Sequence, residues 1–264
     1  MSNRSRLADS YWKFEHRSAG LQAAIAGLDR VLVNSQVSAH LSFAYLPTGM
    51  VYGHTTYVFP LPSHAAFASL QSSPHEMWAR FFGSSLEDRL RYTPTDCFET
   101  FPFPADWETR PDLEAIGREY YAFRASLMVA NDQGLTKTYN SFHNPLERDP
   151  QIVRLRELHA SLDRAVLDAY GWHDVPVTCE FVEENPEDED ADAAPGTRPR
   201  RKKYRYSWPD DVRDGVMGRL IALNTSRAAE EARRGSEADL TLQVAPRKSR
   251  RAPASGDTQG QLAL

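Results

Sequence analysis

Hydrophobic residues follow two different periods along this chain. In the first part, residues 30–37, 40–46 and 51–59 are rich in β-branched and aromatic residues, which predicts three strands. Pro47 and Gly49 lie between the last two stretches, in the sequence PTGM. This sequence is typical of a tight turn with glycine at positive φ, so the two strands are predicted to form a β-hairpin.

Short helices are predicted around these strands. Residues 21–28 have helical spacing, and Ser63 is a capping residue before a second apolar stretch. Ser73 followed by Pro74 indicates the start of a third helix, which Gly83 would end. The first part of the chain is therefore predicted to mix strands with short helices.

Apolar residues after Pro104 recur at three-and-four spacing, which predicts a mainly helical part. The predicted helices cover residues 111–132, 134–144 and 150–172, and Gly171 suits the end of the third. The predicted fold class is therefore α+β.

An acidic run and a basic run follow each other in the rest of the chain. The acidic run EENPEDEDAD is followed at once by the basic run RPRRKKYRY, so the formal net charge of −5 conceals a strong local asymmetry. We predict a mixed strand and helix domain at residues 1–104, a helical domain at 105–182, an acidic-basic linker at 183–203, a final helix region at 204–234 and a disordered tail at 235–264.

Composition excludes several classes of protein. Cys97 and Cys179 do not have the spacing of a zinc site, and two cysteines cannot form a disulfide scaffold. No apolar run approaches the roughly 20 residues of a membrane helix, and the N-terminus lacks the apolar core of a signal peptide. The sequence therefore predicts a soluble, cytoplasmic protein with no membrane partner.

Catalytic motifs are missing from the sequence. It contains no phosphate-binding or dinucleotide-binding glycine loop, no nucleophile elbow and no zinc-protease motif. Residues 143–146, HNPL, lack the second proline and the aromatic residue of an amino-methyltransferase loop, so we interpret them as a helix-ending turn. Asp210 and Asp211 suit a helix start. No catalytic residue, metal ligand or cofactor is predicted for this chain. We interpret His40, His54, His64 and His75 as residues at the edge of the core or on the surface.

A charged strand is predicted at residues 86–92, with Glu87, Arg89 and Arg91 on one face. Arginine can donate two hydrogen bonds to O6 and N7 of guanine, and glutamate can accept one from N4 of cytosine. Glu87 and Arg89 are therefore candidate readers of one C·G base pair, and Arg91 is a candidate contact to the DNA backbone. The alternative is an ordinary solvated strand face, since exposed charges are common.

The basic run offers a second set of candidate DNA-backbone contacts, with tyrosines beside them that could stack on bases. The alternative is a solvated loop. The candidate residues are Arg200, Arg201, Lys202 and Lys203.

Two stretches of the first part, residues 28–61 and 70–104, resemble the target-recognition domain of MmeI-like type IIG restriction-modification enzymes and related phage-defence DNA methyltransferases. Residues 117–128, 134–145 and 158–172 are similar to the helical region that follows recognition in the same family. The resemblance implies that residues 1–104 are a target-recognition domain and that the chain corresponds to a C-terminal piece.

The resemblance also implies a function and a partner. It implies sequence-specific recognition of double-stranded DNA on behalf of an adenine-specific methyltransferase domain or subunit, which would use S-adenosylmethionine. It implies a base-contacting role for the segment that holds Glu87 and Arg89. Two alternatives stay open: a helical protein-interaction or structural module, and an enzyme whose active site is not recognised in the sequence.

Overall fold

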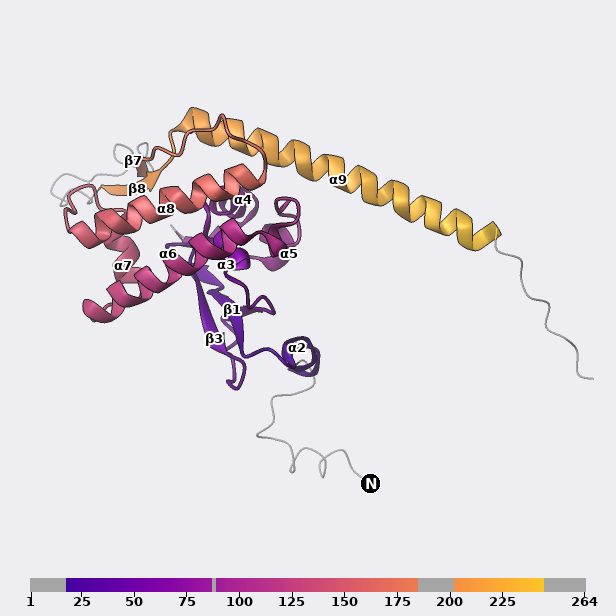
Figure 1. Cartoon of the computed structure of the whole chain (residues 1–264), viewed down its shortest axis with the longest axis horizontal. Helices are drawn as coiled ribbons and strands as arrows, with labels where there is room; N and C mark the ends of the chain where they lie inside the picture. Colours follow the sequence, from indigo (N-terminus) through magenta and orange to yellow (C-terminus); the bar gives the residue numbers. More distant parts are fainter. Residues whose placement is uncertain (1–17, 87–88, 185–201, 245–264) are drawn as a thin grey trace, which may run out of the picture. The chain divides into compact units, whose positions relative to one another are not determined.

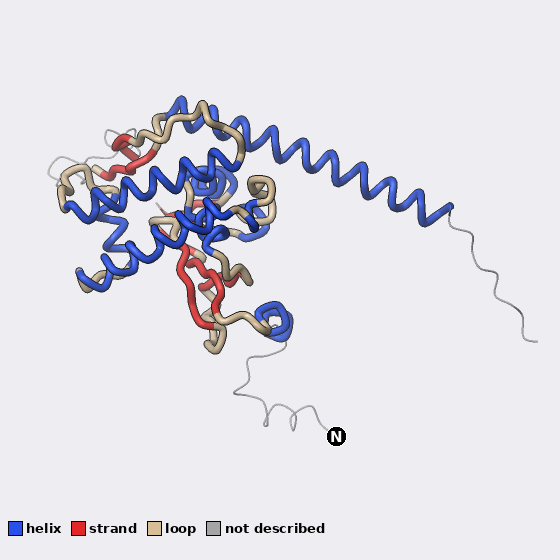
Figure 2. The backbone as a smooth tube through the Cα atoms, in the orientation of Figure 1, coloured by secondary structure: helices blue, strands red, loops and turns tan. Residues whose placement is uncertain are grey.

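The computed structural model of the protein describes residues 18–86, 89–184 and 202–244 (Figure 1). The chain forms two units, one that ends at Asn224 and one that begins at Thr225. Small antiparallel sheets alternate with helices, so the predicted α+β class is confirmed (Figure 2). The elements are α2 (Ser18–Ile25), β1 (Arg30–Ser35), β2 (Val37–Ser38), β3 (Phe43–Pro47), β4 (Thr56–Phe59), α3 (His64–Gln71), α4 (Ser73–Phe82), β5 (Ser84–Leu86), β6 (Arg89–Arg91), α5 (Pro94–Cys97), η1 (Trp107–Thr109), α6 (Pro111–Ala130), α7 (Leu135–Phe142), α8 (Pro150–Ala169), β7 (Glu180–Glu184), β8 (Lys203–Ser207) and α9 (Asp210–Val244).

The first sheet is antiparallel and has the order β3-β1-β4. β1 lies in the centre because its sequence supplies buried residues to both faces of the sheet. Leu32 contributes to the main core, whereas Val31 and Val33 pack against Ile25 of α2 on the other face. β3 and β4 each pair with β1 and not with each other, so the predicted hairpin between them is wrong.

The connection between β3 and β4 also differs from the predicted tight turn. Gly49 does not have a positive φ, and the glycines of the described residues that do are Gly27 and Gly171. Because β3 and β4 lie on opposite sides of β1, their connection must cross this strand and cannot be a two-residue turn. Gly171, with φ 77°, follows α8, so the predicted end of this helix is confirmed.

The second sheet has the order β2-β6-β5 and is joined to the first at Gln36. The backbone N–H of Gln36 donates to the carbonyl of Thr55 at 2.8 Å, and its carbonyl accepts from the N–H of Tyr92 at 2.9 Å. The chain therefore runs from the centre of one sheet to the edge of the other. This places β6 in the middle of a three-stranded sheet.

One hydrophobic core extends across the predicted domain boundary at residue 104. α3 packs on α6, and α6 packs on α8. The sequence shows the change of period at Pro104, but it does not show that the later helices cover the strands. The predicted domains 1–104 and 105–182 thus share one core, to which the first contributes Leu32, Phe43, Phe67 and Leu70 and the second contributes Leu113, Tyr120, Leu155 and Leu162.

Gly117 lies where α6 crosses α3. A Cβ atom at this position would be 2.9 Å from the carbonyl carbon of His64 and 3.2 Å from the Cβ of Ala68, and still nearer to the carbonyl oxygen of His64. We expect Gly117→Ala to destabilise the fold by about 1 to 3 kcal/mol, because backbone atoms on both helices would have to separate. Urea unfolding followed by tryptophan fluorescence measures this change.

The matched control for this prediction is Gly215→Ala. Gly215 is an exposed residue of α9, and a Cβ atom added there would have open space within 4 Å. The substitution is therefore expected to stabilise the helix by about 0.5 to 1 kcal/mol. If Gly117→Ala were as stable as the original chain, the close packing of α3 on α6 would be contradicted.

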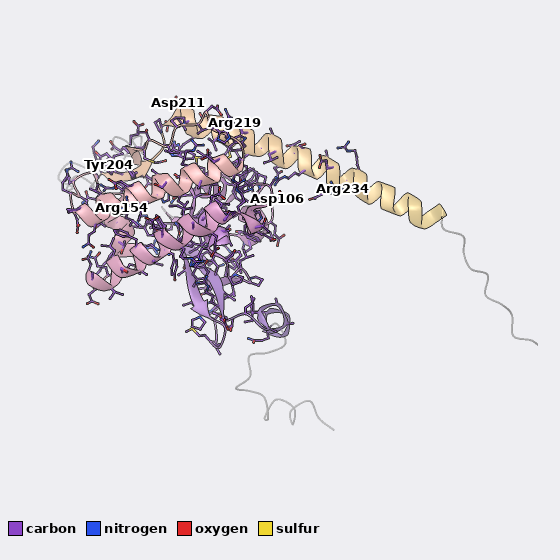
Figure 3. All side chains as sticks on the ribbon, viewed as in Figure 1. Asp106, Arg154, Tyr204, Asp211, Arg219 and Arg234 are labelled. Carbon is purple, nitrogen blue, oxygen red and sulfur yellow. The ribbon has the colours of Figure 1, made fainter. Side chains whose placement is uncertain are left out.

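The predicted linker at 183–203 is wrong at both of its ends. β7 and β8 pair antiparallel, with Glu184 opposite Lys203 and Phe181 opposite Tyr206. The sequence signal is the alternation of basic residues and tyrosines in KYRYS, the sequence of β8. Tyr204 lies on β8 (Figure 3). Residues 185–201, the rest of the predicted linker, lie outside the described residues.

The final helix begins at Asp210, near its predicted start, with Asp210 and Asp211 in the first turn. Its buried residues Val216 and Leu220 pack with Trp208. The helix runs to Val244, so the prediction of a disordered tail is wrong for residues 235–244. Residues 245–264 lie outside the described part. No helix among the described residues is long and apolar enough to span a lipid bilayer.

Candidate nucleic-acid interface

β6 carries the candidate DNA-contacting arginines at the centre of the second sheet. Arg89 and Arg91 are exposed and Leu90 is buried, as the alternation predicted for this segment requires. Leu90 belongs to the main core, which fixes the opposite face of the strand toward solvent. Both arginine side chains therefore lie on the same, solvent-exposed face of β6.

The single strand predicted for residues 86–92 is wrong, because the segment is divided into two. β5 ends at Leu86, β6 begins at Arg89, and the two strands pair with Leu86 opposite Arg89 and Ser84 opposite Arg91. Residues 87 and 88 lie outside the described residues, so the position of Glu87 is not tested. A period of two fits one strand or two paired strands equally, and Asp88, a turn-favouring residue, was the overlooked signal.

Arg89 and Arg91 make no hydrogen bond or ion pair with another side chain of the described residues. Most other arginines of the described part are paired. Arg110 pairs with Asp112 at 2.7 Å, and Arg154 pairs with Glu119 at 3.2 Å. An exposed guanidinium without an internal partner keeps its donors available for a ligand.

Gly83 packs closely against β6 at the end of α4. A Cβ atom at Gly83 would lie 2.9 Å from Leu90 Cδ1 and 3.2 Å from the carbonyl oxygen of Arg91. The last turn of α4 therefore ends directly beside β6. Two aromatic residues of that turn, Phe81 and Phe82, are 63% and 40% exposed.

The basic run is only partly described. Lys202 and Lys203 are exposed, and the ammonium group of Lys202 lies 2.8 Å from Glu183 Oε1. Arg200 and Arg201 lie outside the described residues. The prediction that this run contacts the DNA backbone therefore remains a prediction.

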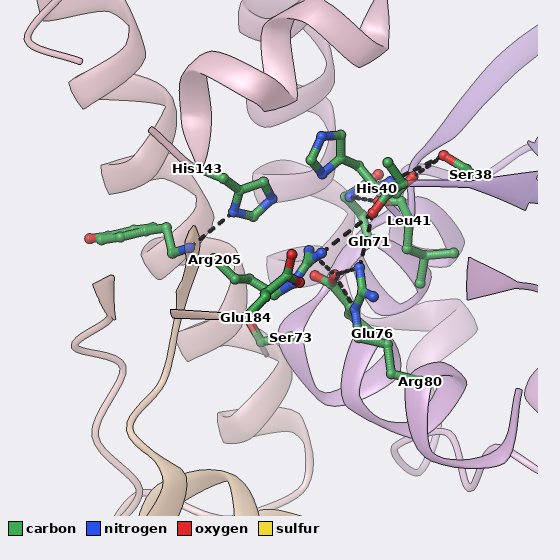
Figure 4. Close-up of polar contacts among 12 residues, drawn as sticks. Ser38, His40, Leu41, Gln71, Ser73, Glu76, Arg80, His143, Glu184 and Arg205 are labelled. Atoms are coloured by element: carbon green, nitrogen blue, oxygen red, sulfur yellow. Dashed lines mark hydrogen bonds and ion pairs between the residues drawn. The ribbon is translucent and has the colours of Figure 1, made fainter. Parts of the chain in front are cut away.

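A half-buried charge network, which the sequence did not reveal, joins α4 to the β7–β8 hairpin (Figure 4). Glu76 Oε1 accepts from Arg80 Nε at 2.9 Å and from Arg205 Nη1 at 3.0 Å. Arg205 also donates to Glu184, and both arginines donate to the carbonyl of Ala39. One carboxylate thus bridges two cations from distant segments.

Electrostatics favours the ionised form of Glu76. Burial would raise the pKa of Glu76, but Arg80 and Arg205 outweigh it, so its pKa lies well below the usual range. Burial and the nearby Arg80 lower the pKa of Arg205, and Glu76 and Glu184 oppose this shift. The network is a structural connection between the sheet region and the hairpin, because its polar atoms satisfy one another.

Two histidines border this network. The ring of His143 stacks on the ring of His40 with centroids 4.9 Å apart, and Nδ1 of His143 accepts the backbone N–H of Tyr206 at 3.0 Å. Nε2 of His40 lies 2.8 Å from Asn140 Oδ1. Burial, with Arg205 as a further cause, lowers the pKa of both rings, which favours neutral imidazoles.

Two further histidines make polar contacts with other residues of the chain. His75 is buried and contacts the carbonyl of Leu70 at 2.7 Å, while His64 contacts Glu114 at 3.0 Å. No group of three or more His, Cys, Asp or Glu side chains in the described part could hold a metal ion.

A serine, a histidine and an aspartate also meet at the start of α4. Ser73 Oγ donates to Asp163 Oδ2 at 2.6 Å and lies 3.3 Å from His159 Nε2. In a nucleophilic triad the histidine lies between the other two groups, with a different ring nitrogen toward each. Here the aspartate accepts the hydrogen bond of the serine hydroxyl directly, and it also accepts one from the backbone N–H of Ser73 at 2.8 Å. Asp163 therefore caps α4, whose first residue is Ser73.

Comparison with known proteins shows that the first part of the chain is similar to a known domain family. Residues 2–105 match the family model described as "MmeI, target recognition domain", whose end lies beside the predicted boundary at 104. Among solved structures, the chain is similar to that of the type IIL restriction-modification enzyme MmeI in complex with DNA, with 16% sequence identity and a TM-score of 0.47.

The likeness to that structure covers 85% of this chain and 26% of the MmeI chain, so this chain spans about a quarter of the length of MmeI. No curated protein matches the chain. The resemblance found in the sequence is confirmed, because residues 2–105 match the model of the MmeI target recognition domain.

Proposed function

We propose that the chain recognises a specific sequence in double-stranded DNA on behalf of a restriction-modification or phage-defence methyltransferase. The observation that carries the proposal is the pair Arg89 and Arg91, exposed and without a partner among the described residues, on the central strand of a sheet within the matched domain. β-Sheet proteins can place strands in a groove of DNA, and arginine is the commonest reader of guanine in the major groove. Arg89 is the proposed base reader and Arg91 the proposed backbone contact.

Catalysis is proposed to belong to a methyltransferase domain or subunit outside this chain, either in the same polypeptide or as a partner. S-adenosylmethionine would bind to that part. Within this proposal the chain is a fragment or a specificity subunit of a site-specific adenine methyltransferase, and the reaction that it directs takes place elsewhere. Glu87 is proposed to read the base opposite the one that Arg89 contacts, and the basic run at 200–203 is proposed to hold phosphates.

Removal of both arginines tests the proposal. We expect Arg89→Ala/Arg91→Ala to weaken binding to a duplex pool by about 10- to 100-fold. The slope of log binding constant against log salt concentration should become smaller by roughly one unit per lost phosphate contact. Fluorescence anisotropy of labelled duplexes, measured at several salt concentrations, gives both quantities.

Lys137→Ala is the matched control for this test. Lys137 is an exposed lysine of α7, outside the matched domain, and has no ion pair with the described residues. Its loss should change neither affinity nor salt slope. Equal binding by the original chain and the double variant would contradict the proposal, and failure of the chain to bind any duplex would favour a protein-interaction module.

A further inference from the structure

The segment that follows β1 holds one edge of β6. The backbone N–H of Tyr92 donates to the carbonyl of Gln36 at 2.9 Å, and β2 pairs with β6 so that Val37 lies opposite Arg91. Hydrogen bonds between neighbouring strands fix the position of one strand relative to the other. A displacement of β2 would therefore be passed on to the strand that carries the proposed DNA contacts.

Beyond β2 the chain turns around the side chain of Ser38. The hydroxyl of Ser38 donates to the carbonyl of His40 at 2.6 Å and accepts the backbone N–H of the same residue at 3.2 Å. Such local hydrogen bonds are typical of serine in turns. The turn brings Ala39 and His40 next to side chains of other elements (Figure 4).

Three elements hold this turn in place. Arg80 of α4 and Arg205 of β8 donate to the carbonyl of Ala39 at 3.3 and 3.4 Å. The shortest contact comes from α7, where Asn140 Oδ1 lies 2.8 Å from Nε2 of His40. An amide oxygen can only accept, so Nε2 carries the ring proton. Because α7 and β8 lie outside the matched domain, later parts of the chain fix a turn that is directly connected to its DNA-contacting sheet.

Asn140 can be changed without disturbing the packing of α7. Its side chain is exposed, whereas the buried residues of this helix are Thr138, Tyr139 and Phe142. The ring of His40, which Asn140 holds, is half-buried. Loss of the amide would therefore release the ring and leave the helix where it is.

We propose that Asn140 is a positioning residue for DNA recognition, which acts through His40 on the placement of β2 beside β6. Hydrogen bonds to base edges require accurate placement of Arg89, whereas attraction to phosphates carries no sequence information. The contact should therefore affect discrimination between DNA sequences more than general affinity. This inference rests on the proposed function, because the position of β6 matters for recognition only if β6 reads DNA.

The test compares the affinities of the full chain for a duplex selected from a random pool and for a duplex of scrambled sequence. Asn140→Ala should lower the ratio of the two affinities by about 2- to 10-fold, the range that corresponds to the loss of one hydrogen bond. Its slope of log binding constant against log salt concentration should stay unchanged, because no phosphate contact is lost. Asn140→Asp keeps an acceptor oxygen at the same position and should keep the ratio.

Thr136→Ala is the matched control, one helical turn earlier on the same face of α7. Thr136 is exposed, and its substitution should leave the ratio unchanged. His40→Phe removes the N–H donor and keeps an aromatic ring against His143. In that background Asn140→Ala should have no further effect, because the two residues act as a pair.

The outcomes separate this inference from the proposed function. A merely structural role would lower both affinities equally, so an unchanged ratio in Asn140→Ala, or additive effects of Asn140→Ala and His40→Phe, would overturn the inference and leave the proposed function intact. If the original chain binds no duplex, the proposed function fails, and hydrogen exchange of the free chain then decides. Faster exchange of the Tyr92 amide in Asn140→Ala than in Thr136→Ala would support the positioning of β6, and equal exchange would overturn it.

Discussion

Glu76→Gln is expected to destabilise the protein by about 2 to 4 kcal/mol, toward the lower end of the effect of breaking a buried ion pair. The substitution leaves Arg80 and Arg205 facing each other without the carboxylate that bridges them at 2.9 and 3.0 Å. The Glu76 side chain keeps 22% exposure, which moderates the cost. Unfolding in urea at neutral pH measures the loss.

The dependence on pH has a definite sign. The folded state lowers the pKa of Glu76, so the network contributes its full stability above the unfolded pKa of about 4.3 and loses it as pH falls below that value. The difference in stability between Glu76→Gln and the original chain should therefore shrink at low pH. A difference that stays constant from neutral to low pH would show that the effect does not come from the charge.

Glu119→Gln is the control for this change. Glu119 and Arg154 form an exposed pair at 3.2 Å between α6 and α8, with side chains 56% and 49% exposed. Solvent screens such a pair, so its loss should cost about 0 to 1 kcal/mol. If both substitutions had the same small effect, the network at Glu76 would be no more than a surface ion pair.

Local periodicity predicted most elements, and the partners of those elements could not be predicted from it. The helices after Pro104 were found because their apolar residues repeat at helical spacing, and Ser63 was found because serine is a typical capping residue; its side chain accepts from Ala66 N–H. The central place of β1 was not found, although RVLV is more apolar than its neighbours. Strand order depends on which faces later helices cover, and that information lies more than 50 residues away, in α6 and α8.

In the candidate site, too, local features could be predicted from the sequence and contacts between distant segments could not. The alternation that exposes Arg89 and Arg91 is local and was predicted. The pair Glu76 and Arg80 is an i,i+4 pair that the sequence displays, but Arg205 is separated from Glu76 by 129 residues and no local pattern connects them. The contact between α7 and the turn after β2 escaped prediction for the same reason, since 100 residues separate the two side chains.

Exchange of the charges at the proposed base-reading positions should change specificity and leave the fold unaltered. In Glu87→Lys/Arg89→Asp a donor replaces the acceptor and an acceptor replaces the donor. A lysine can donate to guanine and an aspartate can accept from cytosine, so the preferred pair at one position should change from C·G to G·C. Each good contact contributes roughly 1 to 3 kcal/mol of discrimination, which corresponds to a complete change of consensus at that position when both contacts are exchanged.

The measurement is selection of duplexes from a random pool by the chain joined to its methyltransferase, with the original and exchanged forms compared. Glu157→Lys/Arg154→Asp is the matched control, because it exchanges the same charges in an exposed α8 pair whose side chains are 58% and 49% exposed. This control should select the original consensus, since α8 lies outside the matched domain. An unchanged consensus in the Glu87→Lys/Arg89→Asp form, or equal weakening at every position, would assign Arg89 to the solvated surface and require other residues to read the bases.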